Sequence, residues 1–276
     1  MRLRVAESGA PGAAPILLLH GWGASIYMWR DWFAPLAAAG RHVFAIDLPG
    51  HGLSDKPADP EVYCLASMVG AVRDFLGREA LSDVDLVAQS MAGTISVELA
   101  LEARTPVRRV VLINPACFGL VRMQRFAKLV SSHPLADAIL PRLVARWLVA
   151  RTHRMVYGDA SRLTSRDEDE YWAPSQFPAF ARAMRKLLHE FRWTRFPAVE
   201  MGARLRGLRE PMLVILGSRD VLVRDAAPYV AELRVAGAPI EVCVVDGGGH
   251  AVNEERPEDV VPLVLRYLAG TGDGAA

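Results

Sequence analysis

One stretch of the sequence decides the fold: DLVAQSMAGTISVELA, residues 85–100. A short apolar run ends at Ala88, and Ser90 follows between small residues. Beyond the serine, Ile95 and Leu99 recur at helical spacing. This pattern predicts a strand that runs through a tight turn into a helix. A serine at the tip of such a turn has a strained backbone and an exposed hydroxyl, and the N-terminus of the helix points at it.

Strand and helix patterns alternate on both sides of this stretch. Residues 3–6 alternate like a short first strand, and continuous apolar runs predict buried parallel strands at residues 16–19, 41–48, 84–88, 110–113, 211–216 and 240–245. Helical spacing predicts helices at residues 28–39, 66–76, 225–236 and 257–268. Strands that alternate with helices in this way predict an α/β protein with a doubly wound, mostly parallel sheet.

The alternation stops after Asn114 and resumes at Pro211. The residues between them read as helical or irregular, with apolar residues at helical spacing over 135–148, interrupted by Pro141, and over 180–193. We therefore expect a core made of residues 1–115 and 210–276. Residues 116–209 are expected to form an inserted helical cap over the C-terminal edge of the sheet.

Three polar residues lie in loops directly after predicted strands: Ser90, Asp220 and His250. Groups placed after the C-terminal ends of parallel strands converge on one crevice. A serine hydroxyl is a weak nucleophile that needs a base to take its proton, and the base needs a carboxylate to hold one tautomer. These three residues are the predicted nucleophile, acid and base.

Their order along the chain, Ser, Asp, His, resembles that of the α/β-hydrolase family. The turn around Ser90 is similar to the family's Gly-x-Ser-x-Gly nucleophile elbow, with Ala88 and Ala92 in place of both glycines and Gly93 following. The resemblance extends over essentially the whole chain, and it implies the α/β-hydrolase fold.

A further motif, His20-Gly21-Trp22-Gly23, is similar to the oxyanion loop of that family. The resemblance implies that the backbone N–H groups of Trp22 and Met91 form an oxyanion hole. Such donors stabilise charge that develops only in the transition state. His20 is expected to satisfy backbone groups and shape this loop.

Other residues are alternatives for these roles or have a simpler structural interpretation. Asp246 lies four residues before His250 and is a rival to Asp220 as the acid. Some family members carry the acid after the preceding strand, where this chain has Asn114, which is no carboxylate. His51 is interpreted as a loop histidine rather than a second base. The basic residues Arg142, Arg146, Arg151 and Arg154 are interpreted as a solvated helix face.

The function predicted from these residues is a serine hydrolase that cleaves a carboxylic ester of a small to medium apolar substrate through an acyl-enzyme. The same triad also serves C–C bond hydrolases of ketone-type ring-cleavage products, thioesterases and acyltransferases. The resemblance disfavours dehalogenase and epoxide-hydrolase chemistry, because those members of the family use an aspartate where this chain has Ser90. A non-catalytic ligand-binding member of the fold is the remaining alternative.

Composition and charge limit the kinds of partner and cofactor that we expect. The chain has 276 residues and a net charge of +1, which gives no electrostatic case for binding nucleic acid, a partner that usually needs a basic face. Its three cysteines, Cys64, Cys117 and Cys243, lie far apart, so no metal spacing is present and we expect reduced thiols, no metal and no cofactor. No apolar run reaches membrane-spanning length and the N-terminus lacks a signal-peptide pattern, so we expect a cytoplasmic protein with a small-molecule ester or ketone substrate. Oligomeric state has no signal in the sequence.

Overall fold

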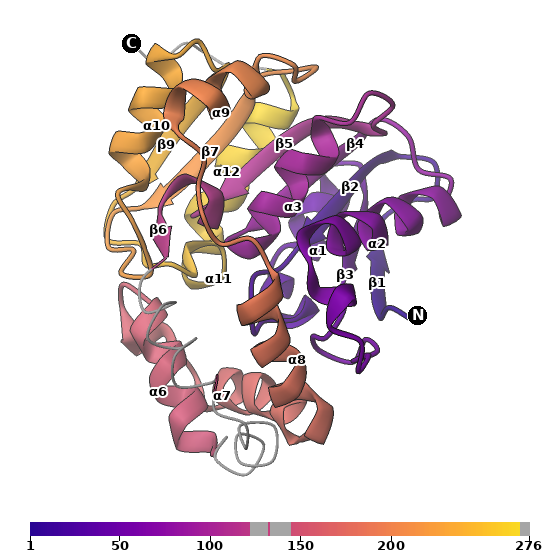
Figure 1. Cartoon of the computed structure of the whole chain (residues 1–276), viewed down its shortest axis with the longest axis vertical. Coiled ribbons are helices and arrows are strands. Elements are labelled where there is room, and N and C mark those ends of the chain that lie inside the picture. Colours follow the sequence, from indigo (N-terminus) through magenta and orange to yellow (C-terminus); the bar gives the residue numbers. More distant parts are fainter. Residues whose placement is uncertain (122–131, 133–144, 271–276) are drawn as a thin grey trace.

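A seven-stranded sheet forms the centre of the computed structural model, which describes residues 1–121, 132 and 145–270 (Figure 1). The strand order is β1-β3-β2-β4-β5-β7-β9, and all neighbours are parallel except β1 and β3. The strands are β1 Val5–Ser8, β2 Ala14–Leu19, β3 Arg41–Ile46, β4 Val84–Gln89, β5 Val107–Ile113, β7 Met212–Gly217 and β9 Ile240–Val245. This arrangement confirms the predicted α/β class and the mostly parallel sheet.

The helices in the described residues are α1 Phe33–Ala38, α2 Leu65–Arg78, α3 Met91–Ala100, α6 Arg146–Val156, α7 Ser165–Trp172, α8 Pro178–Glu190, α9 Ala198–Leu205, α10 Ala226–Val235, α11 Val252–Glu255 and α12 Pro257–Leu268. Strand β9 and helix α12 have the predicted bounds. The first strand begins two residues later than expected, at Val5, where it pairs with β3.

Apolar residues that alternate along the strands divide the core between the two faces of the sheet. Leu17 and Leu19 are buried in one cluster with residues of α2, α3 and α10. Ile16 and Leu18 are buried in a second cluster with residues of α1 and α12. Because successive side chains of a strand point to opposite faces, a continuous apolar run requires helices on both faces.

The helix expected over residues 28–39 is wrong in its extent. The chain forms a 3₁₀ turn over Ile26–Trp29, and α1 begins only at Phe33. Pro35 gives the physical reason, since in one continuous helix it would lack an N–H donor and its ring would clash with the preceding turn. In the observed helix Pro35 lies in the first turn, where backbone N–H groups have no intrahelical acceptor, so the missing N–H of proline costs no hydrogen bond.

Residues 145–209 carry α6, α7, α8 and α9 between β5 and β7; we refer to them as the helical insertion. In Figure 1, α6, α7 and α8 extend away from the sheet, whereas α9 lies beside α10. Before the insertion, β6 (Leu120–Val121) pairs with β8 (Val223–Arg224) in a small antiparallel sheet. The predicted helix over 135–148 lies outside the described residues except for its last part, and the helix expected over 180–193 is α8. The division into a core and a cap at residues 116–209 stays a prediction.

Candidate active site

Ser90 occupies the turn between β4 and α3. Its backbone has φ +53° and ψ −114°, a strained conformation for a residue with a side chain. Two hydrogen bonds fix this turn to the end of β5 and the loop that follows it: the Ser90 N–H donates to Ile113 O at 3.0 Å, and the Ala116 N–H donates to Ser90 O at 3.0 Å. The next residue, Met91, begins α3, so the positive end of the helix dipole lies at the serine.

The two alanines of this turn are completely buried, at Ala88 and Ala92. The closest backbone approach falls one residue later. A Cβ atom at Gly93 would lie 2.8 Å from Cβ of Pro115, so a side chain there would push α3 away from the loop after β5. The glycine that the turn requires is therefore Gly93, and a methyl group fits at Ala88 and Ala92, two residues before and two residues after Ser90.

Ser90, His250 and Asp220 form one chain of hydrogen bonds. Ser90 Oγ lies 2.9 Å from His250 Nε2, and His250 Nδ1 lies 2.8 Å from Asp220 Oδ2. The other carboxylate oxygen of Asp220 accepts the N–H groups of Leu222 at 2.7 Å and Val223 at 3.0 Å. These partners leave Nδ1–H as the donor to the carboxylate and Nε2 as the acceptor of the serine proton. We call this set the candidate triad.

Asp246, the rival carboxylate, is engaged elsewhere. Its Oδ1 accepts the hydroxyl of Ser218 at 3.1 Å, and Ser218 Oγ in turn accepts the Gly247 N–H at 2.8 Å. The pair links the loops after β7 and β9 at their exposed ends. The geometry therefore favours Asp220 as the partner of His250.

Two amide side chains that the sequence analysis did not assign hold the His250 loop against the sheet. Asn114 Nδ2 donates to Gly249 O at 2.9 Å and to His250 O at 3.0 Å, while its Oδ1 accepts the Gly217 N–H at 2.9 Å. Gln89 Nε2 also donates to His250 O, at 3.0 Å. Gln89 is the last residue of β4 and Asn114 directly follows β5, so both lie at strand ends, which is the same signal that identified Asp220 and His250.

The predicted oxyanion loop lies directly against Ser90. A Cβ atom at Gly21 would be 2.2 Å from Gln89 Oε1 and 3.0 Å from Cβ of Ser90, so only glycine allows this approach. Gly23 has φ +76°, a conformation that favours glycine. Trp22 lies between them, 44% exposed, and its indole Nε1 donates to Met184 O of α8 at 3.3 Å.

His20 is completely buried, and both of its ring nitrogens form hydrogen bonds with backbone atoms, as predicted for this residue. Its Nδ1–H donates to Gly21 O at 2.8 Å, and its Nε2 accepts the Leu48 N–H at 3.0 Å. Burial lowers the pKa of His20, against the attraction of the Asp47 carboxylate. His51, 4.9 Å away between ring centroids, is also completely buried, and burial together with repulsion from His20 lowers its pKa well below 6.5. Both imidazole rings are therefore uncharged near neutral pH.

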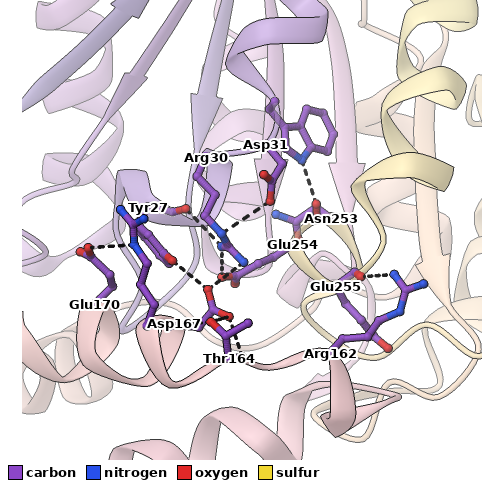
Figure 2. Close-up of polar contacts among 12 residues, drawn as sticks. Tyr27, Arg30, Asp31, Arg162, Thr164, Asp167, Glu170, Asn253, Glu254 and Glu255 are labelled. Atoms are coloured by element: carbon purple, nitrogen blue, oxygen red, sulfur yellow. Dashed lines mark hydrogen bonds and ion pairs between the residues drawn. The ribbon is translucent and has the colours of Figure 1, made fainter.

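A buried ionic cluster joins the helical insertion to the core, with Arg30 at its centre (Figure 2). Its guanidinium contacts Glu254 Oε1 of α11 and lies 2.9 Å from Asp167 Oδ1 of α7. Tyr27 donates to Asp167 at 2.8 Å, and Tyr171 of α7 donates to Glu254 at 2.6 Å. The Glu254 side chain is completely buried and that of Asp167 is 3% exposed, so these charges depend on their partners.

Of the basic residues of α6, Arg151 and Arg154 are exposed and Arg146 is partly exposed. Arg146 lies 3.2 Å from Glu168 and donates to Asp169 at 2.6 Å, and Arg154 donates to Glu168 at 2.5 Å. These pairs join α6 to α7. Arg142, the fourth member of the predicted basic cluster, lies outside the described residues.

Two further features bear on the site. In the part of the chain that the structure describes, no three His, Cys, Asp or Glu side chains are grouped as a metal ion would need. Among residues 1–121, 132 and 145–270, no helix combines the length and the apolar character that crossing a bilayer requires.

A family model described as the alpha/beta hydrolase fold matches residues 14–257. The chain belongs to the alpha/beta hydrolase family. This member is 30% identical over 312 residues to epoxide hydrolase A of Mycobacterium tuberculosis, with 98% of this chain and 95% of the relative covered. It is 26% identical over 277 residues to the dihydrolipoyllysine-residue acetyltransferase component of the acetoin cleaving system of Cupriavidus necator, covering 98% of this chain and 67% of the relative.

Among solved structures, the epoxide hydrolase CorEH without ligand superimposes on this alpha/beta hydrolase with a TM-score of 0.77 at 22% identity, covering 98% of this chain and 95% of that one. The family and the fold predicted from the sequence are thus confirmed. The hydrolases among the relatives support an enzyme of the alpha/beta hydrolase type.

Proposed function

We propose that this alpha/beta hydrolase is a serine hydrolase that cleaves a carboxylic ester of a small to medium apolar substrate through an acyl-enzyme. One observation carries the proposal: the continuous hydrogen-bond chain from Ser90 Oγ through His250 to Asp220, with distances of 2.9 and 2.8 Å. A serine within hydrogen-bond reach of a base, with the base oriented by a third group, is the arrangement that nucleophilic catalysis requires.

In the first half-reaction, Ser90 Oγ forms a bond to the ester carbonyl carbon while its proton passes to His250 Nε2. The charged imidazolium is stabilised by Asp220, whose carboxylate keeps the second proton on Nδ1. Collapse of the tetrahedral intermediate breaks the bond to the alcohol, which takes the proton from Nε2. In the second half-reaction water repeats the sequence on the acyl-enzyme, and the carboxylic acid leaves with Ser90 regenerated.

The backbone N–H groups of Trp22 and Met91 are the proposed oxyanion donors. Met91 is the first residue of α3, where the N–H groups have no acceptor within the helix. The close approach of Gly21 to Ser90 brings the loop that carries Trp22 beside the nucleophile. Donors placed where negative charge develops lower the barrier because they need no reorganisation during the reaction.

The identity of the nucleophile separates this chain from the chemistry of its epoxide hydrolase and dehalogenase relatives. Those relatives resemble it over nearly its whole length, but the family's epoxide hydrolases and dehalogenases use an aspartate at the position of Ser90. A serine forms an acyl-enzyme from an ester, and it has no carboxylate to form the alkyl-enzyme ester that an epoxide or a haloalkane requires. This favours acyl chemistry.

We further propose that the helical insertion covers the nucleophile as the predicted cap. It contacts the loops on both sides of Ser90: the Trp22 indole donates to Met184 O of α8, and the Ala251 N–H donates to Val156 O at the end of α6 at 3.1 Å. A substrate that reaches Ser90 would pass beside these contacts. Substrate selection by the insertion follows from this position.

The test is covalent labelling combined with ester turnover. We expect a fluorophosphonate to label the protein once, at Ser90, and a chromogenic short-chain ester to be hydrolysed. Ser90→Ala should abolish both signals. Ser96→Ala, a buried serine on the same helix, is the matched control and should retain both. Labelling or turnover that persists in Ser90→Ala would refute the assignment of the nucleophile.

A further inference from the structure

The chain that follows His250 forms one turn of helix, α11, which ends in two adjacent buried acidic residues. The side chains of Glu254 and Glu255 are both completely buried. Glu254 belongs to the ionic cluster around Arg30. Glu255 lies apart from Arg30 (Figure 2). Its carboxylate accepts backbone N–H groups, and the Nε of the neighbouring Arg256 lies 3.9 Å from its Oε1.

Three N–H groups converge on the Glu255 carboxylate. Oε1 accepts the N–H of Asp159 at 2.8 Å, and Oε2 accepts those of Gly158 at 3.0 Å and Gly249 at 2.8 Å. Gly158 and Asp159 follow α6 in the helical insertion, whereas Gly249 directly precedes His250. One buried carboxylate thus joins the insertion to the peptide that leads into the base of the candidate triad.

The backbones at this junction are packed without room for side chains. A Cβ atom at Gly249 would lie 2.3 Å from Gly158 N, and one at Gly158 would lie 2.0 Å from Gly247 O. The Ala251 N–H donates to Val156 O at 3.1 Å. A displacement of the insertion at this point must therefore move the loop around His250 or break these contacts.

The His250 loop is thus held from two sides. On the side of the sheet, Asn114 and Gln89 donate to the His250 carbonyl. On the side of the insertion, Glu255 accepts the Gly249 N–H. A carboxylate is the side chain suited to this place, since it carries acceptors only, whereas a glutamine would turn an NH₂ group toward at least one of the three donors.

We infer that Glu255 is a positioning residue for His250 and that it transmits the seating of the helical insertion to the catalytic base. The inference rests on the proposed function, in which His250 takes the Ser90 proton. Displacing the Gly249–His250 peptide changes the distances from the imidazole to Ser90 and Asp220. A displacement of about 1 Å in a reacting group can cost on the order of 100-fold in rate.

The test compares Glu255→Gln with Glu254→Gln, a matched control that is adjacent, equally buried and in contact with the insertion but not with the Gly249 N–H. Both variants are measured for ester kcat and KM, for the pH dependence of kcat/KM, for fluorophosphonate-labelled fraction, and for the titration of His250 by ¹⁵N NMR. We expect Glu255→Gln to lower kcat by roughly 10- to 100-fold with the labelled fraction retained, and to shift the His250 titration. Glu254→Gln should lower the thermal midpoint and leave the His250 titration as in the wild type.

A kcat and a His250 titration in Glu255→Gln that equal those of the wild type would overturn the inference. The inference would also fail if both variants lost kcat equally and each loss matched the fall in the fraction of protein that the fluorophosphonate labels. If Glu255→Gln does not fold, Glu255→Asp takes its place, because it keeps the carboxylate but shortens its reach; an unshifted titration there also overturns the inference. The NMR titration needs no substrate. Absence of Ser90 labelling in the wild type would therefore refute the proposed function separately, while a shifted His250 titration would still support the role of Glu255.

Discussion

The candidate triad and the junction between the core and the helical insertion lie side by side, yet they are held by different kinds of contact. Ser90, Asp220 and His250 follow β4, β7 and β9, and backbone hydrogen bonds, amide side chains and closely packed glycines fix their loops. The junction depends on the buried ionic cluster of Arg30, Asp167 and Glu254. The geometry of the triad is thus tied mainly to the sheet, with Glu255 as its proposed link to the insertion. Attachment of the insertion depends in addition on ion pairs that single substitutions and protonation can break.

The strongest contrast is expected within the triad region itself. Asp220→Asn should keep the fold but favour the wrong tautomer of His250, with a loss on the order of 10⁴ in kcat. Asp246→Asn, in the neighbouring loop, should leave kcat unchanged because its partner is Ser218. Steady-state ester hydrolysis with circular dichroism on the same samples measures both effects. A crippled Asp246→Asn beside an active Asp220→Asn would reverse the choice of carboxylate.

The junction is tested by removing its central cation. Arg30→Met leaves Glu254 buried with a charge that has lost its main partner, and breaking a buried pair of this kind should cost about 3 kcal/mol of unfolding free energy. Arg73→Met, which removes the exposed pair with Glu102, is the control and should cost less than about 1 kcal/mol. Urea denaturation gives both values.

Arg30→Met also distinguishes the helical insertion from the candidate triad. In Arg30→Met we expect faster limited proteolysis within the insertion, while the fluorophosphonate still labels the folded protein fully at Ser90. A labelled fraction that falls under conditions where circular dichroism shows an intact fold would mean that the ionic cluster also maintains the triad.

The smallest expected effect is a pH dependence that differs between the two regions. Burial holds the pKa of His51 well below 6.5, so the unfolded chain binds one more proton than the folded chain as the pH falls below that value. Stability is therefore fully present above pH 6.5 and decreases below it, by about 1.4 kcal/mol per pH unit for one such group. His51→Gln should remove that much of the slope between pH 6 and 5, measured by urea denaturation across the series.

Asp167 at the junction provides the matched control. Its burial would raise the carboxyl pKa, but hydrogen bonds from Thr164 and Tyr27 and the charge of Arg30 outweigh it, so the pKa lies below its ordinary value of 3.8. Its contribution is present above that value and is lost only as the pH falls through the lowered pKa. Asp167→Asn should therefore leave the slope between pH 6 and 5 as in the wild type. Equal slopes in His51→Gln and the wild type would show that other groups take up the protons.

The sequence alone determined the sheet and the residues placed at its edge. Continuous apolar runs identify buried parallel strands, and polar residues directly after them identify Ser90, Asp220 and His250, because both signals are local. The same signal was available for Gln89, the last residue of β4, and Asn114, which follows β5, but amide side chains carry no chemistry that would have singled them out. Local pattern also misjudged the helix over 28–39, where Pro35 makes the chain begin α1 late.

Only the tertiary structure decided which partner each buried charge has. Arg30 meets Asp167 and Glu254 across sequence separations of more than one hundred residues, and Glu255 meets Gly158 and Gly249 through backbone N–H groups that no side-chain pattern reveals. Periodicity reports whether a residue faces a core, whereas the partner of a charge depends on how distant elements pack. For that reason the attachment of the insertion to the His250 loop became visible only in three dimensions.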